Sequence, residues 1–216
     1  MTQIPVVPVR AKRGEMISGT VTFNGTSVIL PDTDRVRMRY ADVMSSLSKT
    51  YGKDLPLVVV DVDGLRRRDI EPDVLKKMKA TRNIWLMTGI RNAGDMMDAF
   101  HGDIGKLVVP YHMTTDADLK EMNELSDSCV PALFLGRGGV HVKKGTVPLR
   151  NVMRTLREMN FRKVLVFVTD DGITDPLSDA GEYCDIVIPY IQKKENAESA
   201  GEMGFTDVMI SASELI

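Results

Sequence analysis

The sequence is poor in the residues that mark secreted, metal-binding and membrane proteins. It has two cysteines in 216 residues, Cys129 and Cys184, and neither has the spacing of a ligand pair. This pattern predicts neither a disulfide framework nor a zinc site. No apolar run approaches the ~20 residues that span a bilayer, and the first residues lack the basic-then-apolar order of a signal peptide. We therefore expect a cytoplasmic protein without membrane contact, metal or cofactor.

An excess of charge of one sign is also missing. There are 28 Lys and Arg residues against 30 Asp and Glu residues, which gives a formal net charge of −2. Such a chain has no overall electrostatic attraction for nucleic acid or for an anionic membrane surface. We expect no nucleic-acid partner.

Short apolar segments are abundant, and they alternate with segments of helical period. Most of them are continuously hydrophobic, which is typical of parallel strands that helices cover on both faces. Two further segments, 20–30 with its Asn24-Gly25 turn and 138–147, have the pattern of hairpins. Only a short end follows the last apolar segment, so a final helix should be short or missing. The eight expected strands span residues 4–10, 55–62, 83–89, 106–113, 130–136, 163–170, 185–190 and 207–213.

The two halves of the chain resemble each other. A shift of about 100 residues aligns 85–109 with 186–210 without a gap, and it pairs Ile90 with Ile191 and Leu107 with Val208. A repeat of four βα units closes most simply into one barrel, because an open sheet would leave edge strands unpaired. The fold class we expect is α/β, a (βα)₈ TIM barrel with a two-fold half-barrel repeat, in a single domain over residues 1–216.

In such a barrel the chemistry gathers where the strands end, at the carboxyl-terminal mouth. Polar residues that end strands or open the following loops are therefore the site candidates. Arginines would hold negative groups, and the turns at Thr88-Gly89 and Ser211 to Ser213 would present N–H groups to a phosphate. The candidates are Arg10, Asp61, Asp63, Thr88, Gly89, Arg91, His112, Arg137, Thr169, Asp170, Asp171, Ser211 and Ser213.

The segment "VVVDVDGLRRRD" (58–69) holds the best pair of carboxylates. Asp61 and Asp63 share strand parity, so both are expected to face the mouth, with Val60 and Val62 facing helices. Asp170 should lie opposite them. Neighbouring carboxylates in a half-dry cavity separate in pKa and serve as acid and base, so we assign catalysis to Asp63 and Asp170. Alternatively, Asp61 forms a salt bridge with an arginine of a neighbouring strand, and Asp63-Gly64 only makes a turn.

Two other features of the mouth allow two interpretations each. His112 could assist in acid–base chemistry, because an unperturbed histidine titrates near 6.5, or it could be a hydrogen-bonded cap of the next helix. The run Arg66 to Arg68 could clamp a phosphate, but three successive side chains diverge, which favours a solvated loop.

Four segments together resemble the family of ProFAR isomerase (phosphoribosylformimino-aminoimidazole carboxamide ribotide isomerase) of histidine biosynthesis. They are "VVVDVDGLRRRDIEPDVLKKM", "TGIRNAGDMMDAF", "FLGRGGVHVKKG" and "TDDGIT". The resemblance implies a TIM barrel and an aldose-to-ketose rearrangement of a phosphorylated ribonucleotide. It also implies an aspartate ending strand one and another ending strand five, as acid and base on opposite sides of the sugar. Pro8 and Leu135 stand at these positions, and neither side chain carries a proton.

Three functions remain open. The first, slightly favoured, is a divergent enzyme, isomerase-like or lyase-like, that acts on a small phosphorylated or otherwise anionic metabolite. The second is a non-catalytic ligand-binding or assembly protein on the same barrel, with a homo-oligomer as one form of assembly. The third is residual ProFAR isomerase activity.

Overall fold

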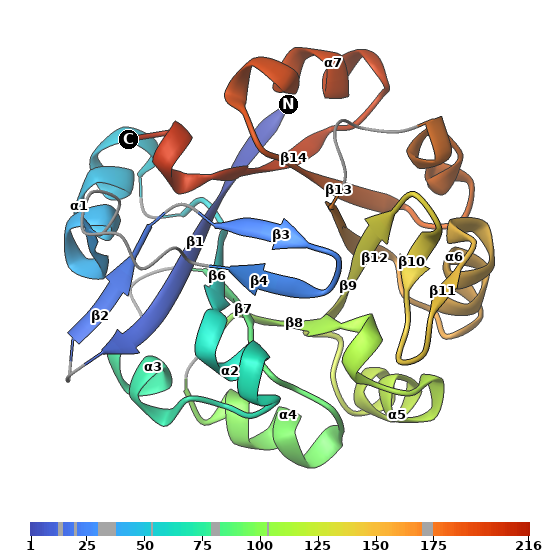
Figure 1. The fold of residues 1–216 in the computed structure, drawn as a ribbon, viewed down its shortest axis with the longest axis horizontal. Helices are drawn as coiled ribbons and strands as arrows, with labels where there is room; N and C mark the ends of the chain where they lie inside the picture. Colours follow the sequence, from blue (N-terminus) through green and yellow to red (C-terminus); the bar gives the residue numbers. More distant parts are fainter. Residues whose placement is uncertain are drawn as a thin grey trace.

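The structure is a computed structural model that describes residues 1–12, 15–19, 21–29, 38–52, 54–78, 83–102, 104–169 and 175–216. Eight parallel strands of this part of the chain form a closed barrel (Figure 1). Each strand pairs with the next, and the last pairs again with the first, as in Val6 with Ser211. In order around the barrel they are β1 (Thr2–Lys12), β6 (Leu57–Asp61), β7 (Ile84–Met87), β8 (Lys106–Pro110), β9 (Cys129–Gly136), β12 (Lys163–Val168), β13 (Ile186–Ile191) and β14 (Asp207–Ser211). The expected TIM barrel is confirmed.

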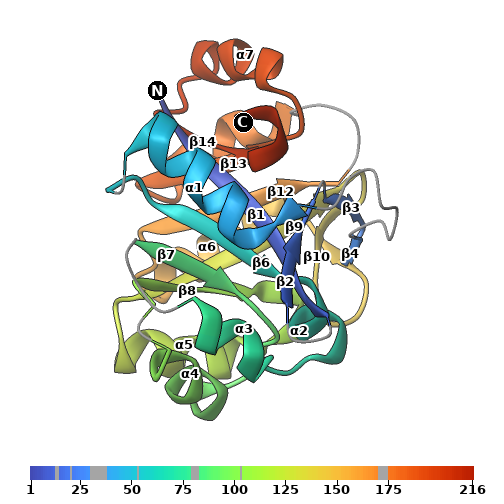
Figure 2. The ribbon, with the colours of Figure 1, turned by 90° about the vertical axis from the view of Figure 1, so that its left-hand side faces the viewer.

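Helices surround the barrel (Figure 2). Helix α6 illustrates why: Val152, Met153 and Leu156 recur at helical spacing and are all buried. After β14 only a single short turn follows, η5 (Ala212–Glu214), which agrees with the predicted short end. The helices are α1 (Tyr40–Tyr51), α2 (Val62–Arg67), α3 (Pro72–Lys77), α4 (Ala93–Phe100), α5 (Asp116–Leu125), α6 (Leu149–Glu158) and α7 (Ala197–Glu202), with 3₁₀ turns η2 (Tyr111–Met113), η3 (Asp175–Glu182) and η4 (Lys194–Asn196).

The parity of β6 is opposite to the expectation. Val58, Val60 and Val62 pack in the barrel interior, whereas Leu57 and Val59 pack against the surrounding helices. The reason is that the interior is filled with apolar side chains and has no room for a row of carboxylates. Asp61 therefore points away from the barrel axis, and Asp63 lies on α2 rather than on a strand.

Both predicted hairpins are present. Strands β3 (Thr22–Asn24) and β4 (Ser27–Ile29) meet at Gly25, whose φ of 54° suits the tight turn. Strands β10 (Gly139–His141) and β11 (Thr146–Val147) extend the sheet beyond β9. Near the first hairpin, β2 (Glu15–Ser18) pairs with β1 and with β5 (Met38–Arg39).

The β3–β4 hairpin lies across the barrel mouth (Figure 1). Its Phe23 is buried among three aromatic side chains near the carboxyl ends of β9, β12 and β13, with ring centroids 5.9 Å from Phe134, 4.8 Å from Phe167 and 5.1 Å from Tyr190. Phe134 and Phe167 stack on each other at 5.3 Å. We call these four residues, Phe23, Phe134, Phe167 and Tyr190, the aromatic plug, because they pack together across the centre of the mouth.

Candidate functional site

A cavity of about 500 Å³ opens beside the aromatic plug, between β1, α2, η2 and the β3–β4 hairpin. We call it the mouth pocket. The lining mixes apolar side chains with charged and hydroxyl-bearing ones. The residues that line it are Arg10, Thr26, Ser27, Val28, Ile29, Val62, Asp63, Leu65, Arg66, Arg68, His112 and Met113.

Arg10 and Asp63 form an ion pair at one end of the pocket. The Nε of Arg10 donates to both carboxylate oxygens of Asp63, at 3.2 and 3.3 Å. Asp63 lies in the first turn of α2 and is buried, while the Arg10 side chain is 28% exposed. The ion pair that the alternative interpretation gave to Asp61 is thus formed by Asp63, from a helix rather than from a strand.

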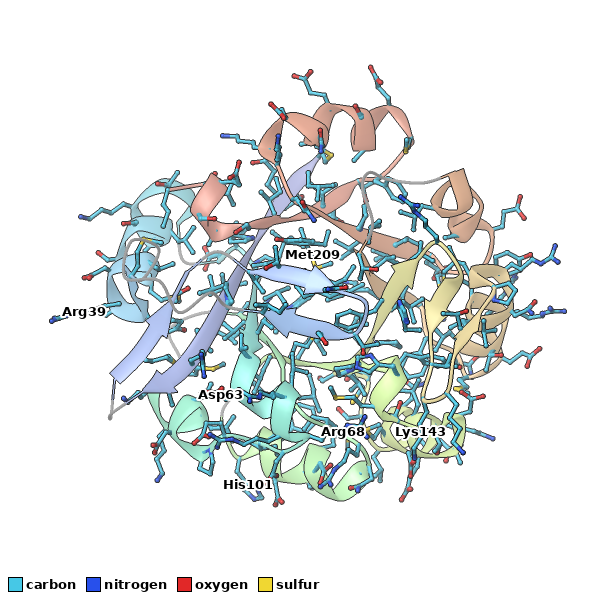
Figure 3. The ribbon with its side chains drawn as sticks, viewed as in Figure 1. Arg39, Asp63, Arg68, His101, Lys143 and Met209 are labelled. Carbon is cyan, nitrogen blue, oxygen red and sulfur yellow. The ribbon has the colours of Figure 1, made fainter. Side chains whose placement is uncertain are left out.

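Arg66 and Arg68 bring positive charge to the same pocket. Helix α2 ends at Arg68, which adopts the left-handed conformation (φ 57°, ψ 48°), and its N–H bonds to the carbonyls of Gly64 and Leu65. Both side chains line the mouth pocket. Figure 3 shows Arg68 and Asp63 on the same side of the barrel mouth. Within the described residues neither guanidinium has a carboxylate partner. The expected loop is wrong, because the segment is the end of a helix, whereas the expected solvation is confirmed, because all three arginines are exposed. Two of them, Arg66 and Arg68, also line the pocket.

His112 closes the inner side of the pocket. It is 6% exposed, and its ring stands edge-on to Phe134 with the centroids 4.9 Å apart. Burial, with the positive charge of Arg68 and the nearby His141, lowers the pKa of His112 to about 4. The imidazole is therefore neutral at pH 7. Its Nδ1 is buried and has no hydrogen-bond partner among the described residues.

Asp61 connects the start of α2 to the end of β7 through hydrogen bonds. It caps that helix, accepting from the N–H of Gly64 at 2.9 Å, and it accepts from the hydroxyl of Thr88 at 2.7 Å. The N–H of Glu71 also donates to it. Burial nevertheless dominates these bonds and raises the pKa of Asp61 to about 6.

Gly89 contributes to the same contact between β7 and α2, because its backbone lies against α2. A Cβ on Gly89 would stand 2.2 Å from the N of Asp69 and 2.4 Å from the O of Gly64. The three candidates Asp61, Thr88 and Gly89 thus hold α2 onto the ends of β6 and β7. None of them lines the mouth pocket.

The remaining candidates are spread around the mouth. Arg91 pairs with Asp95 in α4 through Nε at 3.0 Å and lies outside the pocket. Thr169 donates to the carbonyl of Leu135 at 3.1 Å. The hydroxyls of Ser211 and Ser213 are 2.8 Å apart, and Ser211 bonds to Tyr190 of the aromatic plug.

Arg137 lies exposed in the turn between β9 and β10, and it is not in the lining of the mouth pocket. Asp170 and Asp171 lie outside the described residues, so the expected opposition of Asp170 and Asp63 stays a prediction. The structure thus brings together Arg10, Asp63 and His112 of the candidates, and it adds Arg66 and Arg68.

The two positions that the family resemblance assigns to proton transfer differ in orientation. Pro8 lies between Val7 and Val9, which both pack toward the helices, so strand alternation places it inward. Leu135 packs among helix-facing residues, and its neighbour Phe134 faces the interior. The expectation that both positions flank one cavity is therefore wrong for Leu135.

The described residues contain neither a candidate metal centre nor a candidate membrane span. No group of three or more His, Cys, Asp or Glu side chains is arranged there to hold a metal ion. None of the described helices combines the length and the apolar character needed to cross a membrane.

Comparison with known proteins supports the architecture of the chain. No family model matches the sequence, and no curated protein matches it. Among solved structures, the chain is similar to a chain of the tryptophan synthase complex from Pyrococcus furiosus, with a TM-score of 0.56 and 14% identity over 98% of this chain and 87% of that one. The chain has a TIM-barrel fold. At this identity the likeness supports the architecture alone and carries no activity across.

Proposed function

We propose that the protein binds a small phosphorylated or otherwise anionic metabolite in the mouth pocket. The observation that carries this proposal is the charge of the lining, which contains three guanidinium groups, those of Arg10, Arg66 and Arg68, and one carboxylate, that of Asp63. Guanidinium groups are the side chains best suited to carboxylate and phosphate oxygens. A volume of about 500 Å³ lies within the ordinary range of small-molecule sites.

We further propose that the bound metabolite is transformed, in an isomerase-like or lyase-like reaction. Asp63 and the neutral His112 are groups in the lining that can accept a proton from a ligand. Arg10 holds the Asp63 carboxylate in place. Asp170, from the other half of the chain, is the proposed partner of Asp63.

The resemblance in four segments favours descent from a ProFAR isomerase-like barrel whose own reaction is lost. Pro8, on the inward side of β1, has no proton to transfer. Expression of the chain in a histidine auxotroph that lacks this isomerase should give no growth. Growth would refute the assignment and restore residual ProFAR isomerase as the function.

The aromatic plug favours a second candidate, a non-catalytic ligand-binding or assembly protein. Phe23 occupies the centre of the mouth, where a TIM-barrel enzyme commonly holds its substrate. Asp63→Asn distinguishes the candidates once a ligand is known. An enzyme loses turnover and keeps most of its ligand affinity, whereas a binding protein shows no turnover in either form.

Anion binding itself is tested with inorganic phosphate as the probe. Calorimetric titration should detect binding to the unmodified chain and lose it in the Arg66→Ala/Arg68→Ala double variant. The Arg150→Ala/Arg154→Ala variant is the matched control, because it removes the same charge from exposed positions of α6. Equal affinity in the two double variants would contradict the proposal.

A further inference from the structure

His112 differs from every other polar group of the mouth pocket. Its Nδ1 is the one buried side-chain nitrogen or oxygen of the described residues that has no hydrogen-bond partner. A buried polar atom without a partner is unfavourable and rare in native proteins, and a bound ligand is one of its ordinary explanations. The atom belongs to a ring that lines the cavity.

The positively charged side chains of the pocket are hydrogen-bond donors only. Arg10, Arg66 and Arg68 are pure donors, so they suit an anion and cannot accept a hydrogen bond. The carboxylate of Asp63 is already engaged by Arg10. A ligand that carries both an anion and a hydroxyl group would find acceptors in the hydroxyls of Thr26 and Ser27, in Asp63 and in His112. Of these groups, His112 is the one with a buried atom that has no hydrogen-bond partner among the described residues.

A neutral imidazole supplies such an acceptor. In the tautomer protonated at Nε2, Nδ1 has a free lone pair. The lowered pKa of His112 keeps the ring neutral at pH 7. Nδ1 itself is covered, so a ligand reaches it when a wall side chain changes rotamer. The exposed Arg68, whose charge acts on the His112 ring, is the long side chain of the lining best able to make that change.

We propose that Nδ1 of His112 accepts a hydrogen bond from a hydroxyl group of the ligand, and that this residue makes the mouth pocket selective for hydroxylated anions over anions without a hydroxyl. The proposal rests on the proposed anion site and adds a specificity-determining residue to it. His112 lies after β8, away from the segments on which the family resemblance depends.

The test compares two phosphate esters that differ only in their hydroxyl groups, glycerol 3-phosphate and n-propyl phosphate, with inorganic phosphate as reference. The unmodified chain should bind glycerol 3-phosphate about ten-fold more tightly than propyl phosphate, the usual effect of one well-placed hydrogen bond. In His112→Phe, which keeps an aromatic ring against Phe134, the preference should disappear, while affinity for propyl phosphate stays within about two-fold.

His112→Asn is the matched control, because its amide oxygen can take the place of Nδ1 as acceptor. It should retain most of the preference. Thermal melts without ligand confirm that both variants are folded. A preference that survives in His112→Phe, or equal affinities of the unmodified chain for the two esters, would overturn the role of His112 and leave the anion site standing. Absence of binding for all three probes would overturn the anion site as well.

Discussion

Replacing Asp61 by asparagine should stabilise the protein at neutral pH. The Asp61 carboxyl is 1% exposed, and burial raises its pKa from 3.8 to about 6. At about 1.4 kcal/mol per pH unit, this shift means that the charged form is about 3 kcal/mol less favourable in the folded chain than in the unfolded chain. The asparagine removes that charge and preserves the shape of the side chain.

Of the three hydrogen bonds around Asp61, those with Gly64 and Thr88 can adapt to the substitution. The amide oxygen of the introduced side chain would still accept from the N–H of Gly64, which is 2.9 Å from the carboxylate in the unmodified chain. The hydroxyl of Thr88 now donates to Asp61 at 2.7 Å, and it could instead accept from the new amide. It would then donate to the carbonyl of Asp69, already 3.4 Å away.

The sign of the pH dependence follows from the raised pKa. Between pH 4 and 6 the folded chain binds more protons at Asp61 than the unfolded chain does, so this group stabilises the fold at low pH, and its contribution is lost as the pH rises through 6. Asp61→Asn should match the unmodified chain near pH 4 and be up to about 3 kcal/mol more stable at pH 7.5. Urea denaturation at a series of pH values measures the difference.

The exposed Asp54→Asn is the control and should change the free energy of unfolding by less than about 0.5 kcal/mol. If Asp61→Asn were less stable than the unmodified chain at pH 7.5, the Asp61 charge would be stabilising. The account of Asp61 as a desolvated helix cap would then be refuted.

Three further substitutions test other parts of the structure. His112→Phe should show the opposite pH dependence. As the pH falls from 7 to 4, the free energy of unfolding of this variant should rise by up to about 3 kcal/mol relative to the unmodified chain, because the lowered pKa of His112 destabilises the fold in that range. No such rise would contradict a buried neutral ring. Phe23→Ala should lower the free energy of unfolding by about 3–5 kcal/mol by emptying the aromatic plug, and a loss below about 1 kcal/mol would mean that the hairpin is not packed there. Gly89→Ala should lower the free energy of unfolding by several kcal/mol or prevent folding, because the added Cβ meets backbone on two sides. Gly181→Ala, with open space around it, is the control and should change the free energy of unfolding little. Similar effects of the two substitutions would refute the close approach of Gly89 to α2.

The barrel could be predicted because its signal is repeated along the whole chain. Continuous apolar segments, helical segments between them and a two-fold repeat all favour one closed parallel sheet. Because the segments are continuously apolar, the sequence does not indicate which side of a strand faces inward. Residues 57–62 are apolar except for Asp61, so either parity fits the pattern, and the inward set emerged only from the packing of Val58 and Val60 in the interior.

The site could be predicted only in part, because its geometry depends on backbone detail. Arg10, Asp63 and His112 were expected at the mouth, since each follows or ends a strand. Arg66 and Arg68 converge because the chain turns left-handed at Arg68, and nothing in three successive arginines indicates that turn. The hairpin around Phe23 was predictable from Asn24-Gly25, but its position over the mouth depends on long-range aromatic packing.

A crystal structure of the protein soaked in phosphate tests the central claim most directly. We expect an anion in the mouth pocket, within hydrogen-bond distance of Arg66 or Arg68. Phosphate bound instead at the Thr88-Gly89 turn or at Ser211 to Ser213, with the mouth pocket empty, would contradict it.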